Sequence, residues 1–200
     1  MSCLIIRTSA ALLAGALCLA CGTPPTVISK NAPQASVPNS PQAPVPNSQG
    51  DLRVKAPEGW VSEPPSSSMR VSQYKLPPAD GDTEAASLVL YYFGAGQGGS
   101  VDANLERWIG QMQPADSRPS RDTSSVNGMK VTLLDVTGTY AGGDMGGGGG
   151  AQPKANYRMR AAVIETPKGA YFIKLVGPVK TVNRWDQAFR DFIKSAEFKG

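Results

Sequence analysis

The glycine-rich stretch Gly94–Gly99 is the segment of the sequence with the clearest potential for chemistry. Its G-x-G-x-x-G spacing is typical of turns in which backbone N–H groups and a helix N-terminus hold a pyrophosphate. It lies between an apolar run over residues 87–93 and a predicted helix, which is the context that such a site needs. The later segments are predicted to pair as hairpins, however, and not as parallel units. Gly94, Gly96 and Gly99 are therefore candidate ligand-binding residues, and a simple strand-to-helix turn is the alternative.

Arg158 and Arg160 are the second pair of candidate ligand-binding residues. Because side chains alternate between the two faces of a strand, both arginines lie on one face of a predicted strand. We expect Lys174 to lie on the same face of the sheet, in the next strand. Together these cations would form a basic patch for an anionic ligand, and an exposed sheet face is the alternative. Asp135 is the carboxylate that a hydrolase could use as an acid or base; pairing of the buried carboxylates with Arg or Lys would argue against that role.

The residue types that the chain lacks exclude several kinds of site. It contains no histidine, and its three cysteines all precede residue 22. This excludes Ser-His-Asp and Cys-His nucleophile systems and histidine-ligated metals. We therefore predict no catalytic residue, no metal site and no cofactor. The net charge of +4 over 200 residues is small for a nucleic-acid-binding protein, so we expect no nucleic-acid partner.

The first 20 residues have the pattern of a secretory signal peptide. A single positive charge at Arg7 precedes a short run rich in Ala and Leu, which ends in small residues. The stretch Leu17–Gly22 resembles the lipobox of bacterial lipoproteins, with Cys18 where that family prefers Leu. The resemblance implies that Cys21 is acylated, for example with palmitate, and anchors the chain to a lipid bilayer. Because Gly22 and not Asp follows the cysteine, it also implies the outer membrane; an ordinary cleaved signal peptide is the alternative.

Residues 21–50 are predicted to be a proline-rich tether behind the lipidated cysteine. The segment contains seven prolines, and residues 33–40 are repeated almost unchanged in residues 41–48. Such a composition cannot bury an apolar core and favours an extended polyproline conformation. A proline motif that binds an aromatic groove in a partner is the alternative.

Residues 51–200 are predicted to form the globular domain, an α+β fold with a mainly antiparallel sheet flanked by helices. Alternation and turn residues predict strands over residues 51–55, 69–76, 87–93, 130–140, 157–165 and 170–176. Apolar stripes predict helices over residues 101–112 and 182–196, the first capped by Ser100. Residues 114–121 are predicted to be a loop, and Asn127-Gly128 a hairpin turn.

Four stretches of this domain together resemble uncharacterised envelope lipoproteins with a PsbP-like superfamily domain. They are Ala56–Trp60, Gly98–Asn104 with Arg107 and Trp108, Phe172–Pro178, and Phe189–Ala196. The resemblance implies an α/β/α sandwich and carries no catalytic residues. We therefore expect a membrane-anchored envelope lipoprotein that acts as a non-catalytic binding or assembly module for an unknown protein partner. The alternative is a small-ligand or ion-binding module that uses the Gly94–Gly99 turn or the basic strand face.

Overall fold

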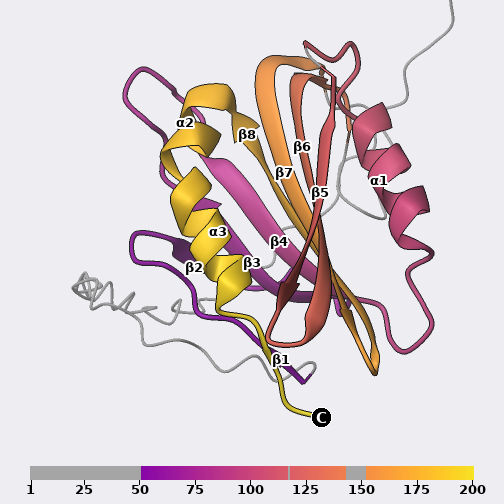
Figure 1. Ribbon diagram of the computed structural model, residues 1–200. Coiled ribbons are helices and arrows are strands. Elements are labelled where there is room, and N and C mark those ends of the chain that lie inside the picture. Colours follow the sequence, from indigo (N-terminus) through magenta and orange to yellow (C-terminus); the bar gives the residue numbers. More distant parts are fainter. Residues whose placement is uncertain (1–50, 117, 143–151) are drawn as a thin grey trace, which may run out of the picture. The chain divides into compact units, whose positions relative to one another are not determined.

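Two antiparallel sheets and three helices make up the part of the chain that this computed structural model describes, residues 51–116, 118–142 and 152–200 (Figure 1). The elements are β1 (Leu52–Arg53), β2 (Val61–Glu63), β3 (Arg70–Leu76), β4 (Ala86–Tyr92), α1 (Val101–Gly110), β5 (Ser120–Val126), β6 (Met129–Tyr140), β7 (Lys154–Thr166), β8 (Gly169–Pro178), α2 (Val179–Arg184), α3 (Asp186–Lys194) and β9 (Glu197–Phe198). The larger sheet has the order β2-β3-β4-β8-β7-β6-β5, and β1 pairs with β9. The predicted α+β class with a mainly antiparallel sheet is confirmed.

The large sheet is covered on both faces, with α1 on one side and α2 and α3 on the other (Figure 1). Its central strands therefore contribute alternate residues to two separate apolar clusters. In β4, Leu88 and Leu90 belong to the cluster under α3, whereas Val89 and Tyr91 belong to the cluster under α1. This is why the run after Ser87, residues 88–93, is apolar, as expected of a strand that is buried on both faces.

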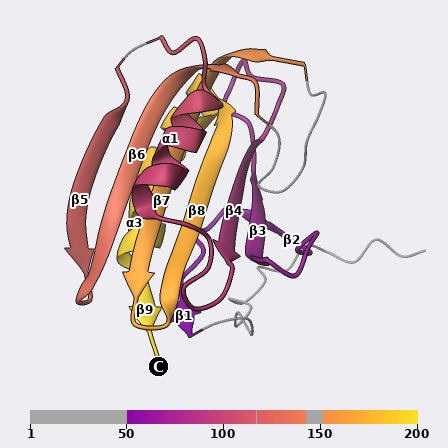
Figure 2. The same cartoon turned by 90° about the vertical axis from the view of Figure 1, so that its right-hand side faces the viewer.

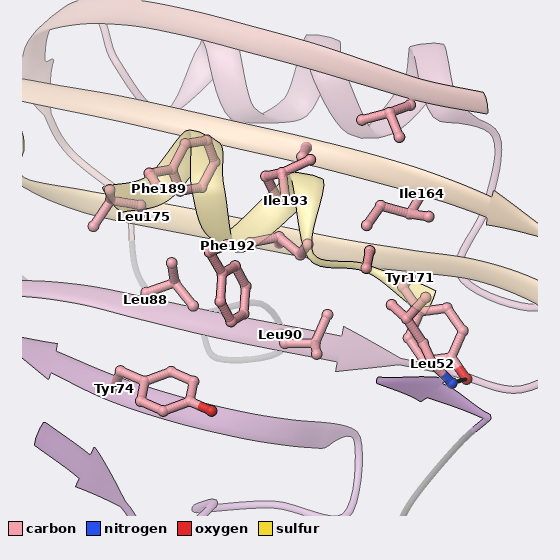
Figure 3. Close-up of a cluster of buried hydrophobic side chains, with 14 of the residues drawn as sticks. Leu52, Tyr74, Leu88, Leu90, Ile164, Tyr171, Leu175, Phe189, Phe192 and Ile193 are labelled. Atoms are coloured by element: carbon pink, nitrogen blue, oxygen red, sulfur yellow. Dashed lines mark hydrogen bonds between the residues drawn. The ribbon is translucent and has the colours of Figure 1, made fainter. Parts of the chain in front are cut away.

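The face under α3 holds the larger cluster. Phe189 and Phe192 point from α3 into the sheet, where Leu88, Leu90 and Leu175 surround them (Figure 3). Both phenylalanines are fully buried, and Phe192 also lies against the ring of Trp60, with 5.2 Å between ring centroids. Burial of side chains of this size stabilises a domain by about 2 kcal/mol each.

The opposite face is covered by α1, which crosses the sheet in front of β7 and β8 (Figure 2). As predicted, Ser100 caps this helix, since its hydroxyl oxygen accepts a hydrogen bond of 3.2 Å from the N–H of Ala103. Trp108 is fully buried and meets the ring of Phe172 edge-on, with 6.5 Å between ring centroids.

Several elements differ from the sequence prediction, among them the short strand β9, which was not predicted. The segment predicted as a loop up to Arg121 already contains the start of β5, an edge strand whose residues are almost all exposed. The short strand β2, at the other edge, was not predicted either. The single predicted C-terminal helix is divided at Trp185, whose Nε1 donates a hydrogen bond of 2.8 Å to the carbonyl of Pro77. This bond and the close approach of the Trp185 ring to Gly59 hold the side chain where the helix changes direction.

The signal peptide, Cys21 and the tether lie outside the described residues. Within residues 51–200 as described, none of the helices has the length and apolar composition needed to cross a bilayer.

Gly138 marks a close approach between two segments of the domain backbone. It lies in β6, and the segment that follows α1 runs directly against it through a bridge between Ala115 and Gly138. A Cβ atom at this position would lie 2.5 Å from the carbonyl oxygen of Pro114 and 2.7 Å from that of Met112. Since both contacts are with backbone, a larger residue can be accommodated only if the strand or the segment moves.

We predict that Gly138→Ala lowers the free energy of unfolding by about 2 kcal/mol, because added core atoms force a backbone shift. Gly110→Ala is the matched control, since a Cβ at this helical glycine meets nothing within 4 Å. It should raise the free energy of unfolding by up to about 1 kcal/mol. Urea denaturation measures both, and equal effects of the two substitutions would contradict the steric argument.

Candidate functional site

The Gly94–Gly99 turn joins β4 to α1 and packs on the apolar layer under that helix. Gly98 has a φ of 92°, and a Cβ there would lie 2.6 Å from the ring of Phe172. Its carbonyl accepts a hydrogen bond of 2.8 Å from Asn104 Nδ2. The strands on both sides of β4 are antiparallel to it, so the parallel β-α-β unit of a dinucleotide site does not surround the turn. A ligand-binding role for Gly94, Gly96 and Gly99 stays a prediction.

Arg158 and Arg160 both lie on the α3 face of β7, as their spacing predicts. Their environment is not an open basic surface, because two carboxylates neutralise them. Asp135 on β6 accepts hydrogen bonds from Arg158 Nε at 2.9 Å and Nη2 at 2.6 Å, and from Arg160 Nη1 at 3.1 Å. Asp186 at the start of α3 lies 2.8 Å from Arg160 Nη1 and 3.4 Å from Arg158 Nη2. The two arginines therefore lie in an ion-pair network, and a ligand-binding role for Arg158 and Arg160 stays a prediction.

This ion-pair network joins the helix layer to the sheet. Arg158 also donates a hydrogen bond of 2.6 Å to Asn183 of α2, and the guanidinium of Arg160 lies 5.6 Å above the ring centroid of Phe189. Burial alone would raise the pKa of Asp135, but hydrogen bonds and charge from Arg158, together with Arg160, lower its pKa below the ordinary value. Asp135 therefore stays ionised and paired, which is unsuitable for the acid/base role considered above.

Lys174 is not beside these arginines. In the β7–β8 register, Lys174 is paired with Ala161, and Arg160 is paired with Leu175. The lysine therefore lies on the α1 face of the sheet, and the prediction that it shares a face with the two arginines is wrong. It is only 2% exposed, with Val89 of β4 on its other side. A lysine so deeply buried is rare in proteins and is found where polar groups surround its ammonium group.

A pocket of about 290 Å³ opens at this lysine, between the ends of four strands. It is lined by Glu84, Ala85, Ser87, Val89, Tyr140, Gly142, Gln152, Lys154, Tyr157, Lys174 and Val176. These residues come from β4, β6, β7, β8 and their connections, so segments 90 residues apart in the sequence build one wall. We did not predict this pocket from the sequence; the available signal was a lysine in the middle of the apolar strand that includes Phe172 and Val176.

Two stacked tyrosines separate the two lysines of the pocket. The rings of Tyr140 and Tyr157 are nearly parallel, at 5°, with 6.0 Å between their centroids. Lys174 Nζ lies 5.7 Å from the centroid of Tyr140 and 3.5 Å from its hydroxyl, whereas Lys154 Nζ lies 5.6 Å from the centroid of Tyr157. Each ammonium group thus faces one ring of the stack, within the distance of a cation–π contact.

Glu84 is the single carboxylate among the described residues that line the pocket. It forms an ion pair with Lys154 and accepts a hydrogen bond of 2.8 Å from the hydroxyl of Tyr157. The bond from Lys154 lowers the pKa of Glu84 and raises that of Lys154. Burial and the bond to Glu84 raise the pKa of Tyr157. At neutral pH the pocket therefore contains fixed charges and hydrogen-bond donors that can orient a bound molecule.

Cys21, the predicted lipidation site, lies outside the described residues. Among the residues that the structure does describe, no group of three or more acidic, histidine or cysteine side chains is placed to hold a metal ion.

Comparison with known proteins identifies the fold but no family. No protein-family model and no curated protein matches the chain. Among solved structures, the chain is similar to LpqN of Mycobacterium tuberculosis, with a TM-score of 0.52, 12% identity, and 74% of this chain and 83% of that chain covered. A second match is PA94, a protein of unknown function from Pseudomonas aeruginosa, with a TM-score of 0.46, 16% identity, and 64% and 82% covered. At this identity, the likeness to LpqN shows a shared fold.

We predict that Asp135→Asn lowers the free energy of unfolding by about 2 kcal/mol at pH 7, because it leaves two partly buried arginines short of a partner. Since folding lowers the pKa of Asp135, its contribution is complete above the ordinary carboxyl pKa and is lost as the pH falls through the folded value. The difference from wild type should therefore shrink below about pH 4.

Urea denaturation at a series of pH values measures this dependence. Asp122→Asn, an exposed carboxylate on β5, is the control and should change the free energy of unfolding by less than about 0.5 kcal/mol. A pH-independent loss for Asp135→Asn would contradict the ion-pair argument.

Proposed function

We propose that this chain is a lipoprotein of the bacterial cell envelope, anchored to the outer membrane through acylated Cys21, and that residues 51–200 are a non-catalytic binding module. The lipobox-like stretch Leu17–Gly22 supports the anchor. The shared fold with LpqN, which is described as involved in cell envelope biogenesis, supports the envelope location. Membership of the PsbP-like superfamily is part of the proposal, because helices on both faces of an antiparallel sheet are what that resemblance implies.

The observation that carries the binding function is the pocket between β4, β6, β7 and β8. Its carboxylate is already matched, because Lys154 and Tyr157 hold Glu84. A carboxylate whose pKa is lowered is a weak base, and a tyrosine whose pKa is raised is a weak acid. These groups are therefore better suited to hydrogen bonding and charge recognition than to proton transfer, in a chain that contains no histidine.

We predict that Cys21→Ser moves the protein from the membrane fraction to the soluble fraction and abolishes incorporation of radiolabelled palmitate. The physical reason is that acyl chains supply the membrane affinity, about 0.8 kcal/mol for each buried methylene. Cys3→Ser is the matched control, because it removes a thiol from the signal peptide and should leave both readouts unchanged. If the Cys21→Ser protein stays in the membrane fraction and is labelled, the proposed anchor is wrong.

A partner protein in the envelope is the second part of the proposal. Chemical cross-linking in intact cells, with the wild-type chain and with Cys21→Ser, should recover the same protein from both when the folded domain carries the specificity. Recovery from the wild type alone would show that the anchor and not the domain selects the partner. If neither chain gives a specific cross-link, the proposed protein partner is wrong.

A further inference from the structure

We propose that β5 is a dimerisation edge, at which a second copy of this chain pairs antiparallel to β5 about a two-fold axis through Thr123. This inference goes beyond the proposed binding function and depends neither on the membrane anchor nor on the pocket. Its support is the exposure of this edge, the direction of its backbone groups and the match of the strand to itself.

β5 is the longer and less protected of the two edges of the large sheet. It spans 7 residues, all but the last of which are exposed, and no further strand of the described residues lies beyond it (Figure 2). Its pairing with β6 contains no register shift, and the strand contains neither proline nor lysine. The opposite edge, β2, spans 3 residues and is followed by Pro64 and Pro65, which donate no backbone hydrogen bond. Short length, prolines, bulges and lysines protect sheet edges from other chains, and β5 has none of the four.

The hairpin register determines which backbone groups of β5 point away from the sheet. The two-residue turn after β5 closes on a hydrogen-bonded pair at Val126, and such pairs alternate along an antiparallel strand. The N–H and C=O groups of Arg121, Thr123 and Ser125 therefore point outward. In agreement, the N–H of Thr123 donates a hydrogen bond of 2.8 Å to Oδ1 of Asp122 and not to β6. A carbonyl of a second strand would replace this local bond.

One register matches β5 to a second copy of itself. Pairing Thr123 with Thr123 of the second copy brings the outward backbone groups together and aligns all 7 residues. In this register, Arg121 faces Ser125 of the second copy, and Asp122 faces Ser124 of the second copy, so no like charges meet. A pairing centred on Asp122 would place two carboxylates face to face, which is destabilising. A pairing centred on Ser124 would leave the first residues of β5 without a partner strand.

The side chains of β5 favour a second copy over a peptide of unrelated sequence. Most of them are the short polar side chains of serine and threonine, which offer little surface by which to select the side chains of a peptide. The backbone groups supply the attraction, and the two charged residues select the register. Arg121 is held by an ion pair of 2.6 Å with Glu106 of α1, so the strand is positioned before a second copy arrives.

Cysteine substitution tests this register in the full chain whose three native cysteines are replaced by serine. Thr123→Cys places a thiol opposite its own copy, with about 5.5 Å between the Cα atoms, a separation that a disulfide spans. Ser125→Cys is the matched control, because it lies on the same exposed strand but about 14 Å from its own copy. Under a mild oxidant, we expect Thr123→Cys to form covalent dimers at least tenfold faster than Ser125→Cys. Equal rates, or no dimer from either variant, would overturn the proposal.

Sedimentation velocity of the same cysteine-free chain measures the association itself. Pairing through one strand buries a small area, so we expect a monomer–dimer equilibrium at chain concentrations up to about 1 mM. Thr123→Pro removes an outward N–H that β6 does not use, and it should weaken the dimer at least tenfold. Thr123→Val keeps that N–H, and it should change the dissociation constant less than twofold.

A chain that stays monomeric, or a Thr123→Pro variant that dimerises as tightly as Thr123→Val, contradicts the β5 interface. Circular dichroism shows whether Thr123→Pro folds, and the comparison of the two cysteine variants decides the question if it does not. Neither measurement uses the membrane anchor or a partner protein. A chain that fractionates with membranes and cross-links to a partner but does not dimerise through β5 therefore contradicts this inference alone.

Discussion

The constraint on which the rest of this domain depends is that β4, β8 and β7 are covered on both faces. The central residues of these strands face one apolar layer or the other, so a charged side chain among them needs polar groups close by. Arg160 points toward α3, where Asp135 and Asp186 neutralise it. Lys174 points toward the α1 side, where Tyr140 lies beside it and a pocket opens. The ion-pair network and the pocket thus each surround a buried cationic side chain with polar groups, on opposite faces of one sheet.

Much of the fold follows from local signals in the sequence. Residues 88–93 are apolar, which predicts a central strand, and Ser100 before an apolar stripe predicts α1. The turn residues Asn127 and Gly128 have φ values of 48° and 79°, as a tight hairpin requires. The edge strand β5 carries no such signal, because a strand with mostly exposed residues owes its conformation to pairing with β6 and not to its own pattern.

The candidate site was predicted less well than the fold, for a reason that lies in strand register. The β7–β8 hairpin closes with Thr166 opposite Gly169, and this pairing places Lys174 opposite Ala161. A shift of one residue in that register would place Lys174 opposite Arg160, on the shared face that the alternation predicted. The two arginines were placed correctly relative to each other, since they lie on one strand. The pocket escaped prediction because four strands build it, and no short segment contains its pattern.

The alternation of β7 also separates the ion pairs from the pocket. Arg158 and Arg160 point to the α3 side and hold the helix layer through Asp186. Tyr157 and Ala161 point to the α1 side, where Tyr157 lines the pocket and Ala161 leaves room beside Lys174. Because successive side chains leave a strand on opposite faces, the pocket can change its lining while the ion pairs behind it stay intact.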